Sequence, residues 1–224
     1  MSIKENLIKI KENIAKACEK SGRNPEDVLI LAVTKTRSAE EINEAISLGI
    51  TDIGENRVQE LMSKYDDVDK NVRWHIIGHL QTNKVKYIAD KVCMIHSVDS
   101  VKLAQEIDRQ CEKIGKVMDI LIEVNSGEEN KNGISYDDVY ALIEEAAAMK
   151  NVRIRGLMTM APLMAEEAEL RKVFSDLHKL SVDIDSKKYD NVSMEYLSMG
   201  MSGDYAIAVE EGATIIRPGR SLFV

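Results

Sequence analysis

Short apolar, β-favouring runs alternate with amphipathic stretches along nearly the whole chain. An unbroken apolar run is typical of a strand that helices cover on both faces, whereas apolar residues three and four apart predict a helix. On this pattern, strands are expected at residues 29–35, 50–54, 72–77, 92–98, 117–124, 152–158, 193–197 and 213–217. Helices are expected between them, at residues 38–48, 57–64, 81–89, 99–115, 135–149, 166–180 and 204–211.

A further helix is predicted ahead of the first strand, because apolar residues recur at helical spacing between residues 3 and 17. Ser2 and Glu5 are placed as a capping box at its start, and Gly22 as a stop signal at its end. Later in the chain, Asp99 is placed to cap the long helix that follows the fourth strand. We expect the extra N-terminal helix to pack against the fold and to do no chemistry.

Eight strands, each separated from the next by a helix, predict a parallel sheet with right-handed crossovers. No linker rich in proline, glycine or serine divides the chain, so one domain is expected over residues 1–224. Eight βα units suggest a closed (β/α)8 TIM barrel, a fold that takes this length as a single unit. An open doubly wound sheet is the alternative. Against it, no strand is followed by the GxGxxG sequence of a dinucleotide-binding crevice.

Composition narrows the classes of function. The net charge of −8 argues against a broad surface for nucleic acid or for an anionic membrane. Cys18, Cys93 and Cys111 form no CxxC pair and no dense pattern, which argues against a disulfide framework and suits a reducing compartment. The N-terminus lacks the apolar core of a signal peptide, and no apolar stretch approaches the ~20 residues of a membrane span. We therefore expect a cytoplasmic protein.

Lys35 ends the first predicted strand, directly after the apolar run at residues 29–34. An ammonium group at such a tip is either lifted into water or held in a pocket. In a pocket, desolvation favours the neutral amine, which is a nucleophile that forms a Schiff base with a carbonyl compound. For this residue taken alone, a solvated lysine at a strand end is the simpler interpretation.

The loops expected after the seventh and eighth strands suit an anion, and in a barrel the C-terminal ends of all strands converge on one mouth. Residues 198–203 are expected to form a turn of glycines and serines that leads into a helix and can present backbone N–H groups to a phosphate. Arg217 and Gly219 add guanidinium donors and a small residue after the last strand. The simpler interpretation is that the glycines only permit tight turns. Asp204 would lie near a bound phosphate, so it has to point outward or cap the helix.

An amine at the end of the first strand and an anion cradle in the loops opposite together suit a phosphorylated aldehyde. Pyridoxal phosphate (PLP) fits this description, a sugar phosphate fits the cradle equally well, and a Schiff-base aldolase would also use a barrel lysine. No metal site is expected, because His75 and His79 lie on a strand and a loop and lack the helical spacing of a metal-binding pair. His75 is more simply a residue of the core or the mouth.

Five blocks of sequence carry a resemblance to known proteins. They lie at residues 32–35, 53–60, 74–84, 197–202 and 216–220. In these blocks the chain resembles the pyridoxal phosphate homeostasis protein family, whose members are single-domain relatives of the alanine racemase barrel. The likeness runs in order over essentially the whole chain, and the block at residues 74–84 is specific to that family.

The resemblance implies that Lys35 carries PLP as a Schiff base and that the loops at residues 198–202 and 217–219 bind its phosphate. It also implies that Arg217 approaches the phosphate or, as an arginine does in the racemase, the pyridine nitrogen. A cation there would disfavour protonation of the ring and make the cofactor a weak electron sink. No catalytic residue is assigned. The expected cofactor-binding residues are Lys35, Asn56, His79, Ser198, Met199, Gly200, Ser202, Arg217 and Gly219.

The resemblance further implies a PLP carrier that acts in vitamin B6 and amino-acid homeostasis without robust catalysis. The racemase has a second, β-rich domain and an opposing tyrosine base, and we expect this chain, which ends at Val224, to lack both. Relatives usually continue past a Phe-Gly, so we also expect a trimmed or altered C-terminus at residues 222–224.

Two other functions stay open at this stage. One is a PLP-dependent amino-acid racemase or decarboxylase, and the other is a cofactor-free sugar-phosphate isomerase or aldolase. The partners that we expect are PLP, amino acids and apo-enzymes that receive PLP, with no nucleic acid and no membrane. The expected oligomeric state is a monomer.

Overall fold

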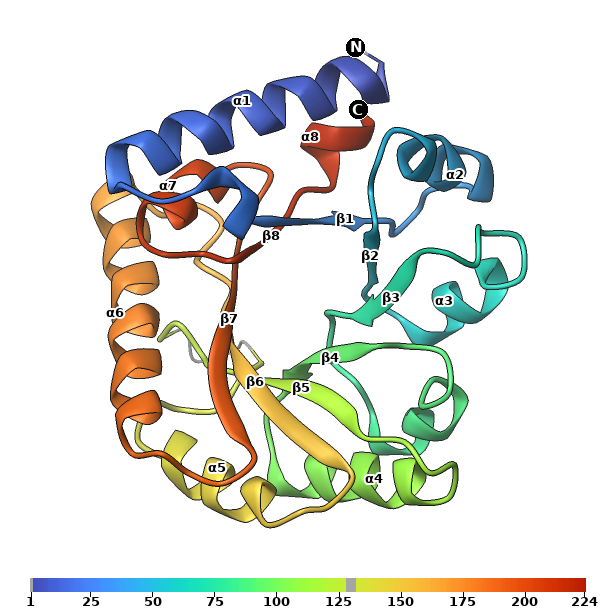
Figure 1. Cartoon of the computed structure of the whole chain (residues 1–224), viewed down its shortest axis with the longest axis vertical. Helices are drawn as coiled ribbons and strands as arrows, with labels where there is room; N and C mark the ends of the chain where they lie inside the picture. Colours follow the sequence, from blue (N-terminus) through green and yellow to red (C-terminus); the bar gives the residue numbers. More distant parts are fainter. Residues whose placement is uncertain (1, 128–131) are drawn as a thin grey trace.

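The computed structural model describes residues 2–127 and 132–224, which form a ring of strands surrounded by helices (Figure 1). Within those residues, eight parallel strands close into a barrel in chain order, and β1 pairs with both β2 and β8. The closed ring confirms the (β/α)8 prediction and rules out the open doubly wound sheet. The strands are β1 (Leu29–Val33), β2 (Asp52–Glu55), β3 (Arg73–Ile76), β4 (Met94–Val98), β5 (Met118–Glu123), β6 (Val152–Met158), β7 (Val192–Met201) and β8 (Ile215–Arg217).

The helices cover the outside of the barrel (Figure 1). Two short 3-10 helices, η1 (Pro25–Asp27) and η2 (Thr82–Tyr87), accompany the α-helices. The α-helices are α1 (Ile3–Ser21), α2 (Ala39–Ser47), α3 (Val58–Lys64), α4 (Val101–Glu112), α5 (Val139–Ala147), α6 (Glu167–Ser186), α7 (Tyr205–Glu210) and α8 (Arg220–Phe223). In the described part of the chain, no helix combines the length and the apolar character needed to cross a membrane.

Among the helical elements, η2, α4 and α8 differ from the sequence-based expectation. Residues 81–89 form only the 3-10 helix η2, because Val85 is its single buried residue and an apolar stripe that could hold a longer helix is lacking. Ser100, and not Asp99, caps α4, since its Oγ accepts a hydrogen bond from the Leu103 N–H at 3.4 Å. Helix α8 was not predicted, because a segment this short shows no periodicity. The predicted polar loop at residues 125–133 lies partly outside the described residues.

Helix α1 lies outside the ring and packs on α7 and α8 (Figure 1). Ser2 and Glu5 form the predicted capping box, and Gly22 ends the helix in the left-handed region with a φ of 67°. Asn6 Nδ2 donates to the carbonyl of Leu222 at 3.0 Å. This hydrogen bond fastens the first helix to α8, so the two ends of the chain lie close together (Figure 1).

The two faces of the strands pack differently. The outward faces join the helices in one large apolar core, as expected for parallel strands under helices. A smaller apolar cluster is separate from it and consists of Leu31, Val33, Ile77, Met94, Leu121, Met158 and Ile215. Fully buried polar side chains interrupt the apolar strands, and they are the features of the fold that bear on function. Those on the strands are Asp52, Glu55, His75, His96, Ser97, Glu123, Ser198 and Arg217.

Candidate functional site

The end of β1 and the loop after β8 lie side by side at the barrel mouth. The Val33 N–H donates to the Pro218 carbonyl at 2.9 Å. A Cβ placed on Gly219 would meet the Val33 Cβ at 3.4 Å, so this loop approaches the strand closely. Lys35 follows Val33 by two residues, so its backbone lies next to the loop that carries Arg217 and Gly219, and this loop is adjacent to β1 and not opposite it as expected.

A buried ion pair holds the segment that carries Lys35. Lys64 Nζ donates to the Thr34 carbonyl and to Glu55 Oε1, both at 2.9 Å. The Thr34 hydroxyl donates to the same carboxylate oxygen at 2.7 Å. Burial raises the pKa of Glu55, and the hydrogen bonds from Thr34 and Lys64 oppose that rise. Lys35 itself is exposed, and within residues 2–127 and 132–224 no hydrogen bond or ion pair engages its side chain.

The loops after β7 and β8 form a small cradle of hydrogen-bond donors. The N–H groups of Gly219 and Ser221 both donate to Ser202 Oγ, each at 3.1 Å. The Ser221 hydroxyl is buried and has no hydrogen-bond partner among the described residues. A buried hydroxyl without a partner is costly, so this cradle has capacity left for an anionic ligand. Ser221 was not predicted, because it lies one residue beyond the sequence block that pointed to the loop.

Asp204 closes the turn at the other side of the cradle. Its Oδ1 accepts a hydrogen bond from the Met201 N–H at 2.5 Å, and it makes no side-chain cap with α7. Of the two roles considered for this residue, the structure gives neither, since its side chain is half-buried and turned back to the preceding strand. Burial raises the pKa of Asp204, opposed by the hydrogen bond from Met201 and the charge of Arg217.

Residues 198–200, expected in a loop, belong to strand β7. The strand was expected to end at residue 197, but it runs to Met201 because β8 supplies a pairing partner as far as Arg217. Gly200 has a φ of 91°, and a Cβ there would lie 2.6 Å from the Ala208 Cβ, so α7 packs tightly against this part of the strand. Met199 is fully buried in the outer core under the helices.

Arg217 and Ser198 meet in the barrel interior. Arg217 Nη1 donates to Ser198 Oγ at 2.7 Å, and Nη2 donates to the Thr159 carbonyl at 2.8 Å. Burial lowers the pKa of Arg217 to about 10, opposed by the charges of Glu123 and Asp204, so the guanidinium remains a cation at neutral pH.

Glu123, at the end of β5, is a buried acid that the sequence analysis did not single out. Its side chain is almost fully buried, and Oε2 has no hydrogen-bond partner in the part of the chain that the structure describes. Burial, and then the charge of Asp99, raise the pKa of Glu123 to about 7, with Arg217 opposing. The signal in the sequence was a carboxylate at the end of a strongly apolar strand.

Two further predicted residues lie at the rim. Asn56 is half-buried after β2, and its backbone packs so closely on Gly78 that a Cβ there would lie 2.5 Å from the Asn56 carbonyl oxygen. His79 is exposed, with Nδ1 3.8 Å from Asp99 Oδ2. The structure thus links Ser202 with Gly219 and Ser198 with Arg217, and it shows no contact of Asn56 or His79 with either pair among the described residues.

A chain of buried side chains runs from the floor of the barrel, where the strands begin, to Arg217. His75 Nε2 lies 2.8 Å from Asp52 Oδ1, and His75 Nδ1 lies 2.9 Å from His96 Nε2. His96 Nδ1 lies 2.8 Å from Ser198 Oγ, which Arg217 also contacts. His75 is a core residue, which confirms the simpler interpretation of it. Asp52 and His96 were missed, although each interrupts an apolar strand.

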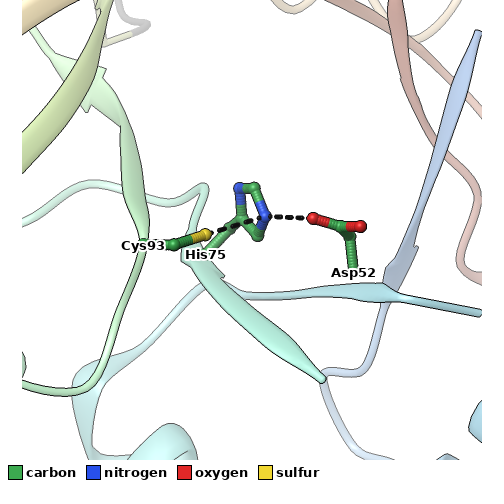
Figure 2. Close-up of side chains that lie close together, drawn as sticks. All are labelled: Asp52, His75 and Cys93. Carbon is green, nitrogen blue, oxygen red and sulfur yellow. Dashed lines mark hydrogen bonds and ion pairs between the residues drawn. The ribbon is translucent and has the colours of Figure 1, made fainter. Parts of the chain in front are cut away.

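At its lower end this chain touches a thiol. Cys93 Sγ lies 3.2 Å from His75 Nε2, and Figure 2 shows Asp52 and Cys93 approaching the ring from opposite sides. Three potential metal-ligand atoms, one each from Asp52, His75 and Cys93, lie within 4.8 Å of one another, a grouping that the sequence did not suggest. Burial works to raise the pKa of Asp52, but hydrogen bonds from His75, Arg73 and Thr51 outweigh it and hold the value at about 2.

One sizeable cavity lies apart from Lys35 and the cradle. It measures about 1010 Å³ and lies between residues 125–127 and 133–136 on one side and helix α6 on the other, where Tyr136, Lys172 and Asp176 contribute to its walls. None of its lining residues is among the residues predicted to bind the cofactor. Its volume therefore does not bear on the site defined by Lys35 and the cradle.

Comparison with known proteins bears on the identity of the mouth site. The family model of the alanine racemase N-terminal domain matches residues 6–224. The chain is 43% identical to the pyridoxal phosphate homeostasis protein of Aquifex aeolicus, over 100% of this chain and 98% of that protein. It is 38% identical to the protein of the same name from Pseudomonas aeruginosa, over 99% and 95% of the two chains.

Solved structures show the same likeness. The structure of PipY from Synechococcus elongatus with PLP bound superposes with a TM-score of 0.86 at 32% identity, and each chain is covered in full. An alanine racemase from Clostridium difficile superposes with a TM-score of 0.75 at 15% identity, over 99% of this chain and 56% of the racemase. The racemase shows a shared fold, and the full-length matches are much closer in sequence.

Proposed function

Because the chain belongs to the alanine racemase N-terminal domain family and, within it, to the pyridoxal phosphate homeostasis proteins, we propose that it binds PLP through Lys35. The Lys35 amine forms a Schiff base with the aldehyde of PLP, and the protein serves intracellular vitamin B6 and amino-acid homeostasis. The observation that carries the proposal is the 2.9 Å hydrogen bond between Val33 and Pro218, which sets Lys35 beside the donor cradle. The PLP bound to PipY, a relative covered in full, supports the same ligand.

The cradle fits a phosphate group. The N–H groups of Gly219 and Ser221 point at one spot, which Ser202 Oγ occupies at 3.1 Å, and the buried Ser221 hydroxyl has no partner among the described residues. Backbone N–H groups and hydroxyls are the donors that commonly bind phosphate. Ser202, Gly219 and Ser221 would hold the phosphate, while Lys35 would hold the aldehyde carbon.

The charge and burial of Arg217 favour a protein that holds PLP over one that uses PLP in catalysis. PLP, when bound, supplies an aldehyde that amines attack and a ring that withdraws electrons when its nitrogen is protonated. Arg217 is a buried cation, fixed by Ser198 and by the Thr159 carbonyl. A cation beside the ring nitrogen disfavours its protonation, so the bound PLP would be a weak electron sink.

A visible absorption titration tests the proposal. We expect PLP to produce a Schiff-base band with the wild-type protein that resists dialysis after borohydride reduction. Lys35→Ala should lose that fixed band, whereas Lys86→Ala, which removes an exposed lysine from η2, should keep it. Retention of the fixed band in Lys35→Ala would overturn the proposed attachment site.

We propose a cytoplasmic monomer that passes PLP to apo-enzymes and whose PLP release responds to amino acids. Light scattering after size exclusion tests the monomer. Reactivation of a PLP-free enzyme by the loaded protein, faster than by an equal amount of free PLP, tests the transfer.

A racemase or decarboxylase is a second candidate, favoured by one observation. Glu123 is a buried, partly unpartnered carboxyl whose pKa of about 7 suits proton transfer at neutral pH. Turnover of L-amino acids by the PLP-loaded protein, well above that of free PLP and abolished in Glu123→Gln, would favour this candidate. A holding protein should show turnover near the background of free PLP in both proteins.

A further inference from the structure

The Asp52–His75–Cys93 grouping at the barrel floor acts as the end of a hydrogen-bond chain and is poorly suited to a dication. Arg73 donates to Asp52 Oδ2 at 2.8 Å, so the carboxylate already has a cation as partner. His75 Nε2 lies 2.8 Å from Asp52 and 3.2 Å from Cys93, distances that a shared N–H accounts for. The grouping matters because the hydrogen-bond chain that starts at Asp52 ends at Arg217.

The chain crosses the barrel interior through partners far apart in sequence. It joins β2, β3, β4, β7 and β8 through Asp52, His75, His96, Ser198 and Arg217. All five side chains are buried, with at most 3% of their surface exposed. A buried environment with a low dielectric constant strengthens hydrogen bonds, and no bulk water is there to replace a missing partner.

Asp52 and Arg217, the two ends of this hydrogen-bond chain, fix the direction of every hydrogen bond between them. Asp52 is ionised and can only accept, so His75 Nε2 carries a proton toward it. Burial lowers the pKa of both His75 and His96, so each ring is neutral and carries one proton at neutral pH. His75 Nδ1 must then accept from His96 Nε2–H.

The hydrogen bonds nearer the mouth have the same direction. His96 Nδ1, left without a proton, must accept from the Ser198 hydroxyl, 2.8 Å away. Arg217 can only donate, and it donates to Ser198 Oγ at 2.7 Å. Every hydrogen bond therefore points from Arg217 toward Asp52, and no other arrangement satisfies both ends.

We propose that Asp52 is a positioning residue for the cofactor site, which through His75 and His96 turns the Ser198 hydroxyl so that its oxygen faces Arg217. The carboxylate thereby sets the acceptor that holds the guanidinium, although it lies at the opposite end of the barrel. The statement about the cofactor rests on the proposed function, which puts PLP beside Arg217. The statement about proton directions does not depend on PLP.

Asp52→Asn is a sharp test, because it keeps the shape of the side chain and should reverse the direction of the hydrogen bonds between His75, His96 and residue 52. Arg73 and Thr51 both donate to Oδ2, at 2.8 and 2.7 Å, so the amide oxygen will take that place and the NH2 group will face His75. His75 Nε2 must then accept, His75 Nδ1–H donates to His96, and His96 Nδ1–H donates to Ser198. The Ser198 oxygen then receives two donors, and its proton has to turn away from His96.

Nuclear magnetic resonance of the histidine ring nitrogens in the protein without PLP reads this directly. In the wild-type protein we expect His75 and His96 both as Nε2–H tautomers, and in Asp52→Asn both as Nδ1–H tautomers. Asp119→Asn is the matched control, since Asp119 pairs with Arg153 and Arg155 on neighbouring β6 and is outside the chain. It should leave both tautomers unchanged. Nδ1–H tautomers in the wild type, or no reversal in Asp52→Asn, would overturn the proposal.

A PLP titration tests the consequence at the mouth. Asp52→Asn should bind PLP up to about tenfold more weakly, with a shifted visible band, because Ser198 Oγ then has to accept from His96 as well as from Arg217 and holds the guanidinium less firmly. In a Ser198→Ala background the same substitution should have no further effect on affinity, because the link to Arg217 is already cut. Equal losses in both backgrounds would overturn the positioning role even if the tautomers reverse. Absence of PLP binding by the wild type would contradict the proposed function. The tautomer result alone would then test the direction of the hydrogen bonds between Asp52 and Arg217.

Discussion

The two ends of the barrel treat their buried polar groups in opposite ways. At the floor, Asp52 is engaged through both oxygens, by His75 on one side and by Arg73 and Thr51 on the other. At the mouth, Glu123 Oε2 and the Ser221 hydroxyl are buried without a hydrogen-bond partner among the described residues. The comparison teaches that the Asp52 carboxylate at the floor is satisfied within the fold, whereas the mouth has bonding capacity that a ligand can use.

The largest effect on the mouth is expected when Arg217 loses its planar guanidinium group. Arg217→Lys keeps the charge but cannot hold Ser198 and the Thr159 carbonyl with one planar group. We expect PLP affinity to fall about 10-fold to 100-fold, the effect of one or two charge-assisted hydrogen bonds. Arg153→Lys, at an exposed ion pair on β6, is the control and should bind PLP normally. Unchanged affinity in Arg217→Lys would show that Arg217 does not serve the ligand.

A milder change separates ligand binding from folding at the cradle. Ser221→Ala removes a hydroxyl that no described residue uses, so the free energy of unfolding without PLP should stay within about 0.5 kcal/mol of the wild type. PLP affinity should fall about tenfold if that hydroxyl binds the phosphate.

Ser181→Ala provides the contrast within the same fold. The Ser181 hydroxyl donates to the His178 carbonyl at 2.7 Å inside α6. Its loss should lower the free energy of unfolding by about 1 kcal/mol and leave PLP affinity unchanged. Denaturant melts and PLP titrations of both variants check the pair, and a Ser221→Ala protein with lower stability and normal affinity would assign Ser221 to the fold.

The buried acid at the mouth gives a pH-dependent prediction. Burial raises the pKa of Glu123 to about 7 from an ordinary 4.5, so the folded state favours the protonated form. The stability that this provides is complete below about pH 4.5 and is lost as the pH rises through about 7. Glu123→Gln, which cannot ionise, should therefore be more stable than the wild type at pH 8, by at most about 3 kcal/mol, and nearly equal to it at pH 4. Thermal melts at the two pH values check this, and a destabilised variant at pH 8 would mean that the carboxylate has a partner.

The smallest effect is expected at the outer edge of the floor. Arg73 is more than half exposed where it pairs with Asp52, so Arg73→Gln should cost less than about 1 kcal/mol. PLP affinity should not change, because Asp52 still accepts from His75 and Thr51. A large loss of affinity in this variant would mean that the floor depends on its surface ion pair.

The sequence predicted the barrel and one half of the site for identifiable reasons. The apolar runs at residues 29–35 and 152–158 mark β1 and β6, because strands buried on both faces need such runs. The placement of Lys35 and of the loops after β7 and β8 at the same mouth was predictable, since parallel strand ends in a barrel converge there, but the loops were expected opposite Lys35 and the one after β8 is adjacent to it. The capping box at Ser2 and Glu5 is a local signal and needed no tertiary information.

The rest depended on contacts between distant residues. His96 and Ser198 are hydrogen-bonded across 102 positions of sequence, and only the register of the closed barrel brings them together. The extension of β7 through Ser198 depended on pairing with β8 in the same way. The unmet bonding capacity of Ser221 and Glu123 depends on what surrounds them and cannot be read from their identity.

Mass-spectrometric mapping of the borohydride-reduced, PLP-loaded protein tests the central claim most directly. The account predicts a single modified peptide, the one that contains Lys35, with full occupancy at one PLP per chain. Modification spread over several surface lysines, with Lys35 unmodified, would contradict the account. The barrel mouth would then have to bind a different phosphate without a covalent bond.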